Sequence, residues 1–121
     1  MKTHKAILID VKAETITEIQ VGDYLDIQHK IGCDIFTIGM HLPDCDAIYV
    51  DDEGLLSVAP ESKFFLMEGA HQPFVGNGLI CGGDSEGETQ NVKMTVDEVK
   101  KQIKFLTLAQ AQLFRSVEDF A

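Results

Sequence analysis

The chain has 121 residues, of which 45% are hydrophobic and 25% are charged, the composition of one soluble globular domain rather than a disordered segment. Twenty acidic residues against ten basic ones give a net charge of -10, which disfavours nucleic-acid phosphates and anionic membranes as partners. The sequence contains no apolar run long enough for a membrane span, and the apolar stretch after residues 1–5 is too short for a signal peptide. We therefore expect a cytoplasmic protein with no membrane association.

The cysteines and the acidic residues have simple structural interpretations. The chain has three cysteines, an odd number, at Cys33, Cys45 and Cys81. They are expected to be free thiols in a reducing compartment. The acidic residues gather between Asp44 and Glu53 and again between Asp84 and Glu88. Such clusters are expected in solvated turns, where they favour solubility.

The first third of the chain predicts a hairpin followed by a helix. Residues 5–11 contain the apolar run 6–9, which is mostly of strand-forming type, and residues 15–21 alternate between apolar and polar with one slip of phase, so an antiparallel pair is expected. Asp23 is placed as an N-cap and Gly32 as the glycine that follows a helix, which predicts a short helix over residues 23–31.

The middle of the chain has strand character broken by turns. Residues 33–42 and 46–51 are predicted strands, and Leu55 with Leu56 is expected to begin a return strand. Residues 64–67 fit a strand or a helix equally well. Residues 74–81 are predicted to form one strand, in which Gly76 and Gly78 mark a bulge or a close backbone approach. A polar loop is expected over residues 82–92.

The C-terminal region has two alternative interpretations. Thr95 and Glu98 match the capping-box pattern and predict the start of a helix. Apolar spacing allows one helix over residues 96–119, about 36 Å long, whereas residues 105–108 also fit a strand followed by a second helix. A continuous helix would extend beyond the body of a domain of this size. Residues 107–121 are therefore a candidate tail for homo-oligomerisation, with Leu113 and Phe114 either at the interface or covering the chain's own core.

Several turn motifs occur in an order that resembles a known family. The motifs are residues 5–10 (KAILID), 49–55 (YVDDEGL), 72–79 (QPFVGNGL) and 83–87 (GDSEG), followed by a short helix ending near Phe105. This order is similar to that of a small domain-of-unknown-function family of hypothetical proteins from bacteriophages, mobile elements and marine metagenomes. The resemblance covers residues 5–105. It implies an α+β fold and a phage or mobile-element source, and it assigns no functional residue.

No residue pattern indicates a metal, cofactor or catalytic site. A zinc site from Cys33, His41, Cys45 and Cys81 lacks a closely spaced anchoring pair. The loop from Asp84 to Glu88 has glycine at the wrong position for a calcium loop. Gly76, Gly78 and the glycines at 82 and 83 match neither phosphate-binding fingerprint. None of the four histidines lies in a nucleophile motif; they are His4, His29, His41 and His71. The sequence therefore assigns no catalytic, cofactor-binding or metal-ligating residue.

These observations predict an α+β fold with a mostly antiparallel sheet of about five or six strands, a short helix near 23–31 and a C-terminal helix, in a single domain over residues 1–121. The expected core comprises Leu8, Ile19, Ile35, Phe36, Ile48, Val50, Leu66, Phe74, Leu79, Val99 and Ile103.

Two functions follow as hypotheses. The first is a non-enzymatic accessory or binding protein of a phage or mobile element, acting on a basic host protein or a small molecule. The alternative is a small hydrolase or ligand-processing enzyme with a pocket between subunits, near His71, residues 76–78 and Cys81. The sequence leaves enzymatic activity uncertain and favours its absence.

Overall fold

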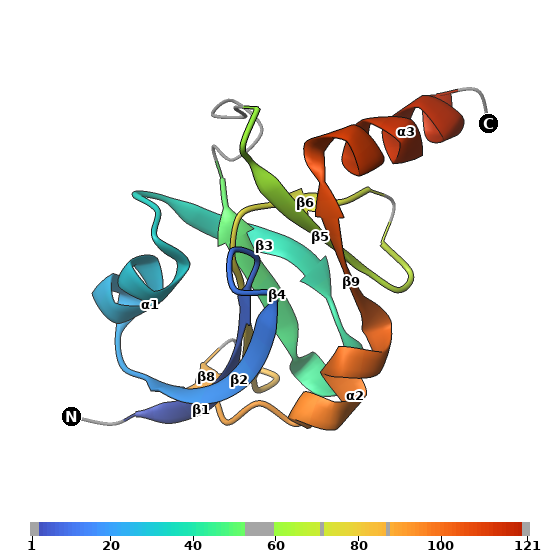
Figure 1. Cartoon of the computed structure of the whole chain (residues 1–121). Coiled ribbons are helices and arrows are strands. Elements are labelled where there is room, and N and C mark those ends of the chain that lie inside the picture. The colour runs from blue at the N-terminus through green and yellow to red at the C-terminus, as the bar shows by residue number, and fades with distance from the viewer. Residues whose placement is uncertain (1–2, 53–59, 71, 87, 120–121) are drawn as a thin grey trace.

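The computed structural model describes residues 3–52, 60–70, 72–86 and 88–119, with the backbone alone for residues 114–119. The strands are β1 (His4–Asp10), β2 (Thr15–Val21), β3 (Phe36–His41), β4 (Ala47–Asp51), β5 (Lys63–Met67), β6 (Phe74–Val75), β7 (Gly78–Gly83), β8 (Thr89–Gln90) and β9 (Ile103–Thr107). The helices are α1 (Tyr24–Ile31), α2 (Val96–Gln102) and α3 (Leu108–Asp119), with a 3₁₀ turn η1 (Pro43–Cys45). The predicted α+β fold is confirmed (Figure 1). Within the described ranges no helix is long and apolar enough to cross a membrane.

The strands form two antiparallel sheets. The larger has six strands in the order β2-β1-β7-β4-β3, with β8 pairing with β7, and the smaller has the order β6-β5-β9. Cross-strand pairs align Leu8 with Leu79, Leu79 with Tyr49, and Tyr49 with Ile38. Because neighbours in register share a face of a sheet, these four side chains form one row across the larger sheet.

The larger sheet is apolar on both faces. One face packs against the smaller sheet and α2, through a cluster that includes Ile7, Ile48, Phe65, Ile80 and Val99. The other face packs against α1, through a second cluster built from Ala6, Val21, Ile27, Ile31, Leu79 and Cys81. A strand buried on both faces needs apolar residues in succession, which explains the continuous apolar runs of β1 and β7.

The predicted core is correct in part. Ile48, Val50, Leu79, Val99 and Ile103 are buried. Leu8, Ile19, Phe36, Leu66 and Phe74 are only half-buried. The prediction for Ile35 is wrong, because 47% of this residue is exposed. Ile35 lies just before β3, which is the last strand at that edge of the sheet among the described residues.

Helix α1 forms where its caps predict it. The Asp23 side chain accepts a hydrogen bond from the backbone N–H of Asp26 at 3.1 Å, which satisfies a donor that the first turn leaves free. Gly32 ends the helix with a φ of 82°, a conformation that favours glycine. Ile27 and Ile31 are four residues apart and both are buried on the sheet.

The single strand predicted over residues 74–81 is instead two strands in different sheets. Gly76 has a φ of 78° and turns the chain out of the smaller sheet. The Asn77 side chain then accepts a hydrogen bond from the backbone N–H of Val11 at 3.0 Å, at the end of β1. The predicted polar loop over residues 82–92 likewise contains the end of β7 and the short strand β8.

The C-terminal region follows the strand-plus-helix alternative, and the continuous helix over residues 96–119 is excluded. Residues 103–107 form β9, which pairs with β5 along its whole length. Residues 64–67, which fitted a strand or a helix, are therefore part of a strand, β5. A new cap begins α3, since Gln110 N–H donates to the Thr107 hydroxyl at 3.3 Å and the Thr107 N–H donates to the Gln110 side chain at 2.9 Å. The return strand expected at Leu55 and Leu56 lies outside the described residues.

Candidate functional site

The acidic segment before β4 contains a strained turn. Asp44 and Cys45 have φ values of 61° and 69°, and each costs about 1–2 kcal/mol in a residue that is not glycine. Asp44 lines two surface hollows. The turn also brings the following residue, Asp46, toward the interior, where only 1% of this residue is exposed.

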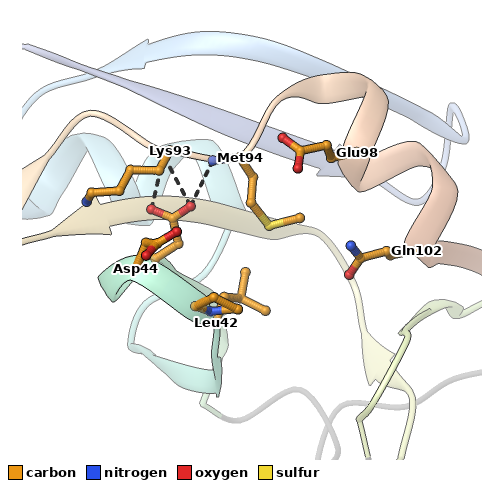
Figure 2. A pocket seen from close by; sticks show the side chains of 8 residues that line it. Leu42, Asp44, Lys93, Met94, Glu98 and Gln102 are labelled. Carbon is orange, nitrogen blue, oxygen red and sulfur yellow. Dashed lines mark hydrogen bonds between the residues drawn. The ribbon is translucent and has the colours of Figure 1, made fainter.

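The Asp46 carboxylate is held by backbone groups from a distant part of the chain. It accepts hydrogen bonds from the Lys93 N–H, 3.1 Å from each oxygen, and from the Met94 N–H at 2.9 Å (Figure 2). These bonds join the start of β4 to the segment before α2. The expectation of a solvated acid is therefore wrong for Asp46, because its role is to fix two segments of the fold.

The hollow beside Asp46, which we call the Asp46 hollow, has a volume of about 200 Å³ and is lined by residues that include Leu42, Asp44, Met94, Glu98 and Gln102. Three of its charged side chains, those of Asp46, Lys93 and Glu98, have partners inside the protein. The Glu98 carboxylate accepts hydrogen bonds from the Thr95 N–H and hydroxyl. The Lys93 ammonium donates to the Gly83 carbonyl at 3.1 Å, and in Figure 2 its side chain extends away from Glu98 and Gln102. The described residues thus provide few polar groups that converge on a ligand here.

A separate hollow lies on the face of the larger sheet that also carries α1. We call it the sheet hollow; its volume is about 250 Å³, and it is lined by residues that include Ile38, His41, Cys45, Tyr49, Cys81, Asp84 and Glu88. His41, Cys45 and Cys81 of the rejected zinc set are thus brought to one hollow. Cys33 does not line it. No group of three or more potential metal ligands occurs among the described residues.

The thiols of Cys81, which is buried, and Cys33, which is half-buried, are poor nucleophiles. Burial, and then the Asp46 carboxylate, raise the pKa of Cys81 from 9.0 to about 12. Burial, followed by the charges of Asp51 and Asp34, raises the pKa of Cys33 to about 11. A thiol attacks as its thiolate, so neither group is poised for catalysis at neutral pH. Cys45 is exposed, and His71 of the enzyme hypothesis lies outside the described residues.

The glycines and acids singled out by the sequence have local structural roles. Gly78 packs against the Phe65 ring, at a place where a Cβ atom would approach the ring carbons to 2.5 Å. The Asp84 carboxylate accepts hydrogen bonds from the Glu86 and Glu88 N–H groups, each at 2.9 Å. The bond from Glu88 is the main reason that the pKa of Asp84 is lowered. The Asp84 side chain therefore organises the local backbone at Glu86 and Glu88.

The most distinctive exposed feature is an apolar surface that runs from α1 to β3. The Phe36 ring lies between Tyr24, at a centroid distance of 4.6 Å, and Tyr49, at 5.2 Å. Ile38 is paired with Tyr49 across the strands. We call Tyr24, Phe36, Ile38 and Tyr49 the α1–β3 surface. Tyr24 is 54% exposed and Ile38 is 40% exposed.

The α1–β3 surface continues into the sheet hollow, because Ile38 and Tyr49 belong to both. Exposed apolar residues that gather on one surface are typical of interaction sites. Sequence reasoning missed it, since Phe36 was predicted as core. No local pattern marks this surface, because the position of β3 at an edge depends on the order of the strands in the sheet.

Comparison with protein-family models matches residues 1–105 to the domain of unknown function DUF3846. The match covers most of the chain, so the chain belongs to this family. It ends within β9 and leaves α3 outside. Comparisons with curated proteins and with solved structures found no match.

Proposed function

For this member of the DUF3846 family, we propose a non-enzymatic binding function, in which the α1–β3 surface docks a basic protein. The proposal rests on one observation, the exposed aromatic and aliphatic residues that join α1 to the edge strand β3. Burying such side chains contributes a favourable free energy of about 25 cal/mol per Å² of apolar area removed from water. Tyrosine is also among the residues that most often dominate binding energy at interfaces.

The charges around this surface favour a basic partner. Asp34 and Asp51 lie close enough to Cys33, near one end of the surface, to raise the pKa of that thiol. Asp84 and Glu88 line the sheet hollow at the other end. The whole chain has a net charge of -10, which attracts a basic partner over distance and accelerates association at low salt. An apolar centre with acidic ends complements a partner that has apolar residues flanked by lysine or arginine.

The resemblance to phage and mobile-element proteins supports a specific setting for this activity. A basic protein of the host, including one that normally binds nucleic acid, has the charge that the surface complements. The accessory protein would then act by occupying that partner. This setting requires no catalytic group on the chain.

The direct test is a selection of random 12-residue peptides displayed on yeast, sorted with the purified protein. We expect enriched peptides to combine alternating apolar residues with two or more lysines or arginines. Their affinity is expected to fall at least about tenfold for a Tyr24→Ser/Ile38→Ser variant, since each truncation removes roughly 1 kcal/mol or more of apolar contact.

A Thr15→Ala/Thr17→Ala variant is the matched control, because both side chains are exposed but lie on β2, at the opposite edge of the larger sheet from β3. Both variants change exposed side chains, and thermal unfolding checks that each is folded. The proposal is wrong if no peptide enriches, if enriched peptides are acidic, or if they bind wild type and the double variant equally.

A further inference from the structure

We infer that the partner binds as an extended strand added to the outer edge of β3. This inference rests on the proposed function and specifies how the basic partner is held. It joins two features of the structure, an open strand edge and the apolar face beside that edge.

Strand β3 is a terminal strand of the larger sheet. It pairs with β4 on one side, and the sheet order places no described strand on the other. Thr37, Ile38, Gly39 and His41 are all exposed. A terminal strand presents unpaired N–H and C=O groups in a row, which is a template for an incoming strand.

The opposite edge of the same sheet lacks the properties of a docking edge. The exposed residues of β2 are polar, namely Thr15, Thr17, Glu18 and Gln20, and α2 contacts this strand. Charged and polar side chains are how proteins protect a sheet edge from unwanted pairing. The two edges are therefore different, and only β3 combines backbone access with apolar side chains.

The apolar face of β3 determines which side chains of the incoming strand contact the protein. Phe36 and Ile38 are two residues apart and pair with Asp51 and Tyr49, so both lie on the face that carries α1. An added strand places every second side chain beside them. Apolar side chains at those positions extend the row formed by Ile38, Tyr49 and Leu79.

The bulge at Gly39 limits the pairing. The register shifts between Ile38 and Met40, and a bulge of this kind twists the strand and interrupts its ladder. Backbone pairing is therefore short, and the side-chain contacts must supply the specificity.

The positions of the acids define the spacing of basic residues in the partner. Strand β4 lies alongside β3 and spans five residues. It runs from Ala47, which lines the sheet hollow, to Asp51, which pairs with Phe36. At about 3.3 Å per residue this is about 13 Å. An extended segment covers that length in about four residues, so the two basic residues are expected roughly four to six positions apart. A helical segment would need about nine.

A second copy of this chain is a poor occupant of the same edge. Two such copies would each bring a net charge of -10 and would place the acids around one surface against those of the other, which opposes association. A basic strand reverses the sign of that interaction. The occupant is therefore a different protein with an exposed basic segment.

The inference is tested with a peptide from the selection, resynthesised with N-methyl groups on alternate backbone amides. One series is methylated at odd positions and the other at even positions, with side chains unchanged. In an added strand alternate amides face the neighbouring strand. We therefore expect one series to lose affinity at least about tenfold, through two or more lost hydrogen bonds, and the other to retain the affinity of the parent peptide.

Equal binding by both methylated series, with affinity still dependent on Tyr24 and Ile38, overturns strand addition and leaves the binding surface in place. A peptide whose affinity does not depend on Tyr24 and Ile38 instead removes the proposed function itself. Enriched peptides with basic residues about nine positions apart also overturn strand addition, because they indicate a helical ligand.

Discussion

Asp44 and Asp46 are two residues apart and have opposite environments. Asp44 is exposed, whereas Asp46 is buried and accepts hydrogen bonds from the backbone of Lys93 and Met94. A carboxylate that accepts backbone N–H groups forms charge-assisted hydrogen bonds, which are stronger than neutral ones. At the residue scale, then, Asp46 holds the fold together and Asp44 remains at the surface.

Replacing these two aspartates in turn tests this difference. Asp46→Asn keeps the size of the side chain and removes its charge and one acceptor, so we expect the free energy of unfolding to fall by about 1–3 kcal/mol. Asp44→Asn is the matched control and is expected to change it by less than about 0.5 kcal/mol, since asparagine tolerates the left-handed conformation at this position. Urea unfolding measures both. Equal effects would contradict the assigned role of Asp46.

The three thiols are expected to react at very different rates. Cys45 is exposed, whereas burial raises the pKa of Cys33 to about 11 and that of Cys81 to about 12. Iodoacetamide at pH 8, followed by peptide mass spectrometry, should therefore modify Cys45 first and Cys81 last. Modification of Cys81 as fast as Cys45 would show that the strand is not buried as described.

The same pKa shift predicts how stability depends on pH. Because the folded protein favours the protonated Cys81 thiol, the stabilisation is complete below pH 9.0, the pKa of an exposed thiol, and is lost as pH rises toward about 12. We expect the free energy of unfolding to fall over this range, and a Cys81→Ala variant to show a shallower fall. An equally steep fall in the variant would assign the effect to other groups.

At the element scale, the decisive feature is the break between β6 and β7. Gly76 turns the chain from one sheet to the other, and Gly78 then lies against the Phe65 ring in the core between them. The two glycines thus allow neighbouring segments to enter different sheets and still pack closely.

A Gly78→Ala substitution tests the close packing. The added methyl group would overlap the Phe65 ring, and overpacking of this kind typically costs about 1–3 kcal/mol. Gly32→Ala is a useful comparison, since Gly32 has open space around it but a left-handed backbone, and it should show the cost of conformation alone, about 1 kcal/mol. Thermal or urea unfolding reports both. A neutral Gly78→Ala would contradict the described contact.

Local signals predicted the elements that depend on local chemistry. The caps at Asp23 and Gly32 located α1, and the Thr95–Glu98 capping box located the start of α2. The sequence also contains a second capping pattern, Thr107 to Gln110, which marks the start of α3 and excludes a continuous helix. This pattern favours the strand-plus-helix alternative, which apolar spacing alone leaves open.

Other features depend on contacts between distant segments. The partners of Asp46 lie 47 and 48 residues away, and no local pattern distinguishes it from the acids around it. The exposure of Ile35 depends on the order of strands in the sheet, which places β3 at an edge. The candidate binding surface could not be predicted for the same reason, since it exists only where α1 and that edge meet.

At the scale of the whole molecule, α3 is a second candidate for association. It extends from the end of β9 away from the two sheets (Figure 1), and Leu113 on it is 68% exposed. Phe114 lies outside the described side chains. Residues 108–121 contain one arginine and two acids, so charge repulsion between copies is weak here. We propose that α3 joins copies of the chain, separately from the α1–β3 surface.

Light scattering during size-exclusion chromatography tests this proposal. The full chain is expected to be an oligomer, and removal of residues 108–121 to shift it toward monomer while circular dichroism still reports the sheets. Leu113→Ser should produce a smaller shift in the same direction. A monomeric full-length protein would contradict it.

The most direct test of the binding account is a map of backbone amide chemical shifts during titration with a selected basic peptide. We predict that the largest changes occur in β3, β4 and α1, that β2 and α3 change little, and that the affinity falls as salt is raised because the acids at the ends of the surface are screened. Shifts concentrated at the Asp46 hollow, or on β2, with β3 unchanged would contradict the account.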